Sequence, residues 1–203
     1  MKNFYQYVLC LFLIISQNFN AHAGASGIVS EDFYIPSEAP NIQLFMRYKH
    51  LAGAKATTPD KILLYVHGAT YPSETAFDLP IDGKSMMDLL AAAGYDVYLV
   101  DVRGYGLSSR PLEMEMPAQD NSPIVHTADA VSDFGSAVNA ILKRHHVSKI
   151  NVMGWSWGSS TVGMYTSLNN HKVNRLILYA PLWLFAKDTA LPTGPTVAKL
   201  GAY

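Results

Sequence analysis

The chain has 203 residues, of which 49% are apolar and 15% are charged, and its formal net charge is −1. This composition excludes an intrinsically disordered chain and fits a single domain with a large core. The small net charge and the absence of a basic block exclude nucleic acid as the expected partner.

The first 23 residues have the composition of a secretory signal peptide. Lys2 supplies a positive start, residues 8–15 form an apolar run, and Ala21-His22-Ala23 is a small-x-small cleavage site. The apolar run is too short for a membrane span, which needs about 20 residues. We therefore expect export to the periplasm or the medium, with no stable membrane anchor. Cys10, the only cysteine, would leave with the peptide, so the mature chain would contain no disulfide.

The remaining sequence alternates between strand-like and helix-like segments. Strands are predicted at residues 32–36, 42–48, 62–66, 95–100, 150–153 and 173–179. Helices are predicted at residues 83–93, 128–145 and 159–168, the second of them capped by Thr127. Residues 107–123 are polar and proline-rich, so they are expected to be loop.

This alternation predicts an α/β fold with a mainly parallel sheet and helices on both faces. In such sheets the chemistry gathers at the carboxyl ends of the strands. Three marked turns follow predicted strands there, and their sequences are HGAT, DVRGYG and GWSWGS.

The third turn has the pattern G-x-S-x-G, which is Gly154-Trp155-Ser156-Trp157-Gly158 in this chain. A strand that turns at once into a helix leaves space only for small neighbours, and the serine projects its oxygen beside a helix N-terminus. Ser156 is therefore the candidate nucleophile. The N–H of Trp157 would point at the oxyanion that forms when Ser156 attacks a substrate.

With these turns in this order, the sequence resembles the α/β-hydrolase family over roughly residues 42–180. The resemblance implies that Ala69, which follows His67-Gly68, gives the second oxyanion N–H. It also implies that His67 is structural, and that Asp101 and Arg103 stabilise the second turn. No metal or organic cofactor is implied, and the expected partner is a small-molecule acyl substrate.

A serine nucleophile needs a general base and an orienting carboxylate, and in this family they follow the serine as acid and then histidine. After Ser156 the chain has only His171 and Asp188. His171 is expected at the opposite end of the sheet from Ser156, and Asp188 comes several residues late. His126 could reach the correct face, although the family gives it no such role.

The family's last strands and most of its cap have no counterpart in the sequence. The predicted domains are therefore a signal peptide at residues 1–23 and an incomplete hydrolase domain at residues 24–203, with a cap beginning near residue 181. The strand at residues 173–179 would be an exposed apolar edge. We expect the chain to be the N-terminal part of a longer protein, nearly inactive by itself.

The leading hypothesis is an exported serine hydrolase that cleaves an ester, thioester, lactone or amide through an acyl-serine intermediate. A serine at this position disfavours the family's dehalogenase and epoxide-hydrolase branches, which use aspartate. Two alternatives stay open: a non-catalytic binding protein or decayed enzyme, and a hydrolase whose acid and base come from a partner chain. Trp155, Trp157, Tyr71 and Phe77 are expected to contribute to an apolar pocket, but the substrate and the oligomeric state are not predicted.

Overall fold

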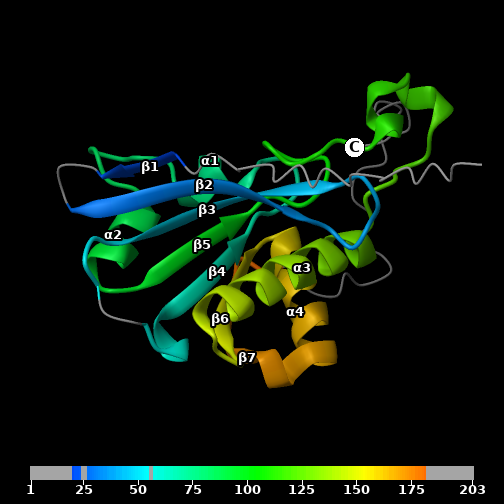
Figure 1. Ribbon diagram of the computed structural model, residues 1–203. Coiled ribbons are helices and arrows are strands. Elements are labelled where there is room, and N and C mark those ends of the chain that lie inside the picture. The colour runs from blue at the N-terminus through cyan, green and yellow to red at the C-terminus, as the bar shows by residue number, and fades with distance from the viewer. Residues whose placement is uncertain (1–19, 24–26, 55–56, 182–203) are drawn as a thin grey trace, which may run out of the picture.

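The computed structural model describes residues 20–23, 27–54 and 57–181, which form one sheet covered by helices (Figure 1). The sheet has seven strands in the order β1-β2-β3-β5-β4-β6-β7. The strands are β1 (Asn20–Ala23), β2 (Ile28–Pro36), β3 (Gln43–Leu51), β4 (Ile62–Val66), β5 (Asp96–Val100), β6 (Ile150–Trp155) and β7 (Val173–Tyr179). The helices are α1 (Ser73–Phe77), α2 (Met86–Ala92), α3 (Thr127–His145) and α4 (Trp157–Asn169).

The predicted fold class is confirmed by the strand directions. The pairs β4–β5, β4–β6 and β6–β7 are parallel, whereas β1–β2, β2–β3 and β3–β5 are antiparallel. It follows that β2, β4, β5, β6 and β7 run in one direction, and only β1 and β3 run in the other. The carboxyl ends of β4, β5 and β6 therefore meet at one edge of the sheet, which we call the carboxyl edge; the opposite edge is the amino edge.

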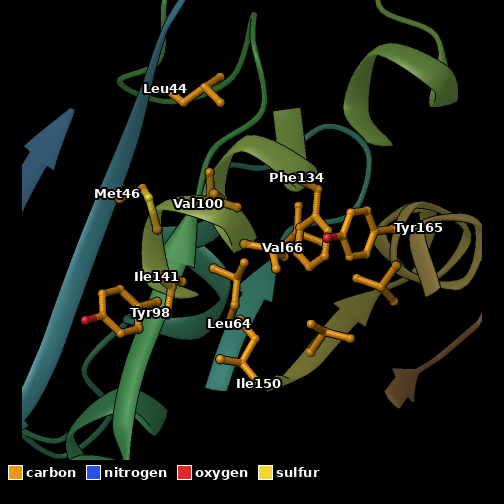
Figure 2. Packing of buried hydrophobic residues seen from close by; sticks show 14 of the residues in the cluster. Leu44, Met46, Leu64, Val66, Tyr98, Val100, Phe134, Ile141, Ile150 and Tyr165 are labelled. Atoms are coloured by element: carbon orange, nitrogen blue, oxygen red, sulfur yellow. The ribbon is translucent and has the colours of Figure 1, made fainter. Parts of the chain in front are cut away.

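The central strands are apolar because both of their faces are covered. Every residue of β4 and of β5 is buried. Alternate side chains enter two separate cores, one packed with α3 and α4 and the other with α1 and α2. Figure 2 shows the first core, where Leu64 and Val66 of β4 lie among Tyr98, Val100 and Phe134.

The N-terminal strands are longer than predicted. The first predicted strand, residues 32–36, is the end of β2, which begins at Ile28 and pairs along its whole length with β3. The strand expected at residues 42–48 continues to Leu51 for the same reason. The cleavage site predicted after Ala23 falls at the end of β1, so removal of the leader would also remove this strand.

Two helix starts also differ from the prediction. α2 begins at Met86 rather than Gly83, because Asp82 and Gly83 form a tight turn closed by hydrogen bonds between Ile81 and Lys84. In α3, Thr127 is the first helical residue and His126 is the cap. The carboxylate of Asp129 accepts the His126 N–H at 2.9 Å, which satisfies this helix start.

Strand β7 forms one side of the sheet and is exposed apart from its first residue. Among the described strands it pairs only with β6. Four of its apolar side chains are 37–60% exposed, and they are Leu176, Ile177, Leu178 and Tyr179. The exposed apolar strand at the side of the sheet, which the sequence predicted, is therefore present in the described part of the chain. The predicted cap and Asp188 lie outside the described residues.

Candidate active site

Ser156 occupies the sharp turn between β6 and α4, at the carboxyl edge. We call this turn, residues 154–158, the elbow. Its backbone has φ 52° and ψ −119°, a conformation that residues other than glycine rarely adopt. Two hydrogen bonds fix this conformation: the Ser156 N–H donates to the Tyr179 carbonyl at 3.0 Å, and the Ser156 carbonyl accepts the Ser159 N–H at 2.9 Å. The strained position is held by the strand beside it and by the first turn of α4.

The flanking glycines are required because backbone meets backbone at this turn. A Cβ atom on Gly154 would lie 2.1 Å from the Gly158 carbonyl oxygen. A Cβ atom on Gly158 would lie 2.3 Å from the carbonyl oxygen of His67. These distances are far below van der Waals contact, so no other residue fits without a backbone shift. This is the steric reason for the G-x-S-x-G pattern.

The turn after β4 lies directly against the serine. A Cβ atom on Gly68 would be 3.0 Å from the Cβ atom of Ser156, so the chain reaches Ala69 immediately beside the elbow. In the described part of the chain, neither the Ala69 N–H nor the Trp157 N–H donates to a backbone carbonyl. Ala69 and Trp157 also line the same cavity, of about 860 Å³. The structure thus brings together the three residues predicted from the sequence.

His67 is a structural residue with both ring nitrogens engaged. Its Nε2 accepts the Val102 N–H at 3.1 Å, so Nδ1 carries the proton and donates to the Gly68 carbonyl at 2.6 Å. The ring is fully buried, and burial lowers the pKa of His67 to about 4. The imidazole is therefore neutral and ties the turn after β4 to the turn after β5.

Asp101 organises the turn after β5. Its Oδ1 accepts the Ser73 N–H at 2.8 Å and its Oδ2 accepts the Leu107 N–H at 3.3 Å. Burial raises the pKa of Asp101, and these two donors oppose the rise. Gly106, with φ +50°, passes so close that an added Cβ atom would lie 1.9 Å from Asp101 Oδ2.

Arg103 anchors the same turn to α3. Its guanidinium forms a bidentate pair with Asp133, with Nη2–Oδ1 at 2.7 Å and Nε–Oδ2 at 2.9 Å. Asp133 is fully buried and also accepts the Ser37 hydroxyl at 2.6 Å. Hydrogen bonding to Asp133 raises the pKa of Arg103. This pair is a structural link between β5 and α3, and it leaves Arg103 no free face for a substrate.

The described residues place no general base against Ser156. His171 lies in the short turn before β7, whose first residue Val173 pairs with Ile150, the first residue of β6. It is therefore at the amino edge, opposite Ser156. His126 is exposed and lines the same cavity as Ala69 and Trp157, but no hydrogen bond joins it to Ser156 among the described residues.

Aromatic side chains near the elbow divide between core and cavity. Trp157 lines the cavity, and its Nε1–H donates to Thr127 Oγ1 at 3.0 Å, whereas Trp155 packs against the core under α1 and α2. The sequence also hinted that Tyr71 and Phe77 contribute to an apolar pocket. Phe77 instead stacks on Tyr65 in the core at 4.0 Å, and neither Tyr71 nor Phe77 lines this cavity.

The residues that the structure describes contain no cluster of three or more His, Cys, Asp or Glu side chains able to hold a metal ion. No helix there is both long enough and apolar enough to cross a bilayer.

The α/β fold, with Ser156 in a strained turn at its carboxyl edge, indicates a protein of the α/β-hydrolase class. The sequence profile of the alpha/beta hydrolase fold family matches residues 61–200. The chain therefore belongs to the α/β-hydrolase fold family. No curated protein matches the sequence.

Solved structures with the same fold are much longer than the matched segment. Cfl2 from Burkholderia cenocepacia is similar over 82% of this chain and 47% of its own, with TM-score 0.55 and 18% identity. Epoxide hydrolase VrEH1 from Vigna radiata matches 80% of this chain and 44% of its own, with TM-score 0.55 and 13% identity. A predicted CIB-like hydrolase from Thermoplasma acidophilum matches 77% and 65%, with TM-score 0.52 and 21% identity. The chain spans less than two thirds of each of these proteins.

Proposed function

We propose that this protein is an exported serine hydrolase that transfers an acyl group from a small-molecule ester, thioester, lactone or amide to water. The observation that carries the proposal is the strained backbone of Ser156, with φ 52°, between two glycines that cannot accept a side chain. Backbone strain of this kind costs free energy and persists where the surrounding structure enforces it, often at an active site. Close packing explains why a small residue occupies this turn, and a serine there adds a hydroxyl nucleophile.

In this mechanism the Ser156 oxygen attacks the acyl carbonyl carbon. The carbonyl oxygen becomes an oxyanion, which the N–H groups of Ala69 and Trp157 stabilise by donating hydrogen bonds. Trp157 is also the first residue of α4, so the positive end of the helix dipole reinforces this stabilisation. Collapse of the intermediate releases the leaving group and leaves an acyl-serine, which water then hydrolyses.

The proton transfers require a base and an orienting acid. We propose that both are supplied by residues outside the described part of the chain, because no described histidine is hydrogen-bonded to Ser156. The α/β-hydrolase branches that act on epoxides place an aspartate at the elbow, whereas this chain has Ser156. An acyl-serine intermediate is therefore preferred over an alkyl ester of aspartate.

Hydrolysis of p-nitrophenyl esters by protein from the complete reading frame tests the proposal. Ser156→Ala is expected to lower kcat by about 10⁶-fold, since removal of a serine nucleophile typically has that effect. Ser160→Ala is the matched control, because Ser160 lies in the same helix but outside the elbow. An unchanged rate in Ser156→Ala would contradict the proposal, as would an equal loss in Ser160→Ala.

A non-catalytic binding protein is the second candidate. The observation in its favour is that the described residues combine a large cavity with no base at Ser156. This candidate predicts ligand binding without ester hydrolysis, even from the complete reading frame.

Export is a separate part of the proposal. The signal peptide proposed at residues 1–23 predicts that the N-terminal residue of the mature protein is Gly24. Sequencing the N-terminus of the protein from the periplasm or medium of the expressing cells would test it. A protein that retains Met1 and stays inside the cell would contradict it.

A further inference from the structure

The lining of the cavity beside the elbow does not include Ser156, but it includes Trp157, the residue that follows it. Its wall near the elbow is formed by Ala69 and Trp157, whose N–H groups are the proposed oxyanion donors. Other parts of the lining come from the turn after β5, at Gly104 to Gly106, and from the residues that lead into α3. A volume of about 860 Å³ lies in the range of pockets that enclose whole small-molecule ligands, roughly 300–1,000 Å³.

Much of the lining of this cavity is apolar. Tyr105, Met114, Val125 and Trp157 contribute large apolar surfaces to it. The indole of Trp157 is fixed by its hydrogen bond to Thr127. Met114 packs on Gly104, since its Sδ atom would lie only 2.6 Å from a Cβ atom at that glycine. Met114 can therefore occupy this place in the lining only because Gly104 has no side chain.

Among the described residues, Arg110 is the one Lys, Arg, Asp or Glu side chain in this lining, and it is already paired; the exposed ring of His126 also lines the cavity. Arg110 lines the cavity, but its Nε pairs with Glu115 Oε1 at 2.6 Å. One of its Nη atoms donates to the Gly104 carbonyl at 3.3 Å. An anionic group in the cavity would therefore find no unpaired guanidinium, whereas an uncharged alkyl chain would contact apolar side chains.

We propose that this cavity is the acyl subsite, and that it takes an uncharged, largely apolar acyl group much larger than acetyl. The inference rests on the proposed function, because it places the acyl carbonyl oxygen on the N–H groups of Ala69 and Trp157. The substituent on that carbonyl carbon then enters the cavity those two residues line. Met114 and Val125 limit its length.

Calorimetric titration of the full chain with butyrate, hexanoate and octanoate tests the subsite without requiring catalysis. These carboxylates are the products of the proposed reaction, so the carboxylate would occupy the oxyanion donors and the alkyl chain the cavity. Affinity is expected to rise by up to about fourfold per methylene, the limit set by full burial of each group. Equal affinity for the three acids would overturn the proposal.

Three variants locate the binding. Val125→Phe fills the cavity and is expected to weaken octanoate binding at least tenfold while changing butyrate binding less than twofold. Met114→Ala removes an apolar wall and is expected to weaken octanoate binding several-fold. Met116→Ala is the matched control, because Met116 is exposed and does not line the cavity. An effect of Met116→Ala equal to that of Met114→Ala would overturn the assignment.

The test of the subsite can succeed or fail independently of the test of the proposed function. Chain-length-dependent binding that Val125→Phe abolishes, without ester hydrolysis, would support the subsite and contradict the hydrolase. Hydrolysis that depends on Ser156, with a rate independent of acyl length, would support the hydrolase and contradict the subsite.

Discussion

Both edges of the sheet carry paired histidine and aspartate side chains, but in the described part of the chain only the carboxyl edge adds a strained turn with a serine. At the amino edge, the Tyr48 hydroxyl donates to Asp96 at 2.7 Å, and the hydroxyl of Tyr98 lies 2.7 Å from Nε2 of His145. Asp96 in turn lies 3.8 Å from Nδ1 of His145. The rings of Tyr48 and Tyr98 stack at 4.3 Å. Every reactive group of this cluster is paired, so the cluster holds α3 against the sheet.

At the carboxyl edge, the polar side chains that fix the turns after β4 and β5 are paired as well, but the turn that carries Ser156 is fixed by close backbone contacts. The elbow depends on Gly154 and Gly158, and the described residues leave the N–H groups of Ala69 and Trp157 without a backbone acceptor. The first N–H groups of a helix have no intrahelical acceptor, so the N–H of Trp157, the first residue of α4, can donate to a ligand. The comparison teaches that a sterically enforced, strained backbone distinguishes the candidate site from a structural cluster better than residue type does.

The largest effect on stability is expected at the elbow glycine. Gly154→Ala places a methyl group 2.1 Å from the Gly158 carbonyl oxygen, so the backbone of β6 or α4 must move. We expect the free energy of unfolding to fall by more than about 3 kcal/mol, as in severe overpacking, or the protein to fail to fold. Urea denaturation followed by circular dichroism measures this change.

Gly163→Ala is the matched control for the elbow. Gly163 lies inside α4, and an added Cβ atom would meet no atom within 4 Å. Alanine is favoured over glycine inside a helix by about 1 kcal/mol, so this variant should be slightly stabilised. A Gly154→Ala variant as stable as Gly163→Ala would refute the close backbone packing at the elbow.

A smaller effect on the free energy of unfolding is expected from the titration of His67. Its pKa is about 4 in the folded chain, whereas a histidine in the unfolded chain titrates near 6.5. Between these values the unfolded state binds a proton that the folded state does not, so stability is lost as the pH falls from 6.5 towards 4. The loss approaches about 3 kcal/mol.

The measurement is the free energy of unfolding at several pH values, compared with that of His67→Gln. The variant cannot titrate at this position, so its stability should depend less steeply on pH. An imidazole NMR signal of His67 that titrates near pH 6.5 in the folded wild-type protein would contradict the assignment of a buried, neutral ring.

The smallest effects are expected for two buried tyrosines that face the same core. Tyr98→Phe leaves Nε2 of His145 without its partner, which should cost about 1–3 kcal/mol. The Tyr165 hydroxyl has no hydrogen-bond partner among the described residues, and Figure 2 shows it directed toward Phe134. Tyr165→Phe should therefore leave stability unchanged or raise it by up to about 1 kcal/mol. Equal destabilisation by both substitutions, measured by urea denaturation, would contradict this distinction.

Much of the fold could be predicted because the central strands are continuous apolar runs that end in glycine turns. The segment at residues 62–66 matches β4, since a strand buried on both faces has an unambiguous pattern. The start of β2 was missed because Ile28 is followed by half-exposed residues whose partner strand lies elsewhere in the sequence. The tight turn at Asp82 and Gly83 hid the true start of α2.

The candidate site followed from short-range motifs, whereas its surroundings did not. Ser156 and Gly158 are specified by local backbone sterics, so the sequence pattern was sufficient to find them. The bond between Trp157 and Thr127, and the position of Met114 over Gly104, join residues from separate elements. Nothing in the local sequence indicated these contacts, and for the same reason Phe77 was assigned to a pocket when it lies in the core.

The most direct test of the central claim is covalent capture of the nucleophile. Protein from the complete reading frame would be treated with a fluorophosphonate, digested with trypsin and analysed by tandem mass spectrometry. The account predicts one adduct on Ser156 and none in Ser156→Ala, although Ser159 and Ser160 lie on the same tryptic peptide. Equal labelling of Ser156→Ala, an adduct on Ser159 or Ser160, or no adduct on the folded protein would contradict it.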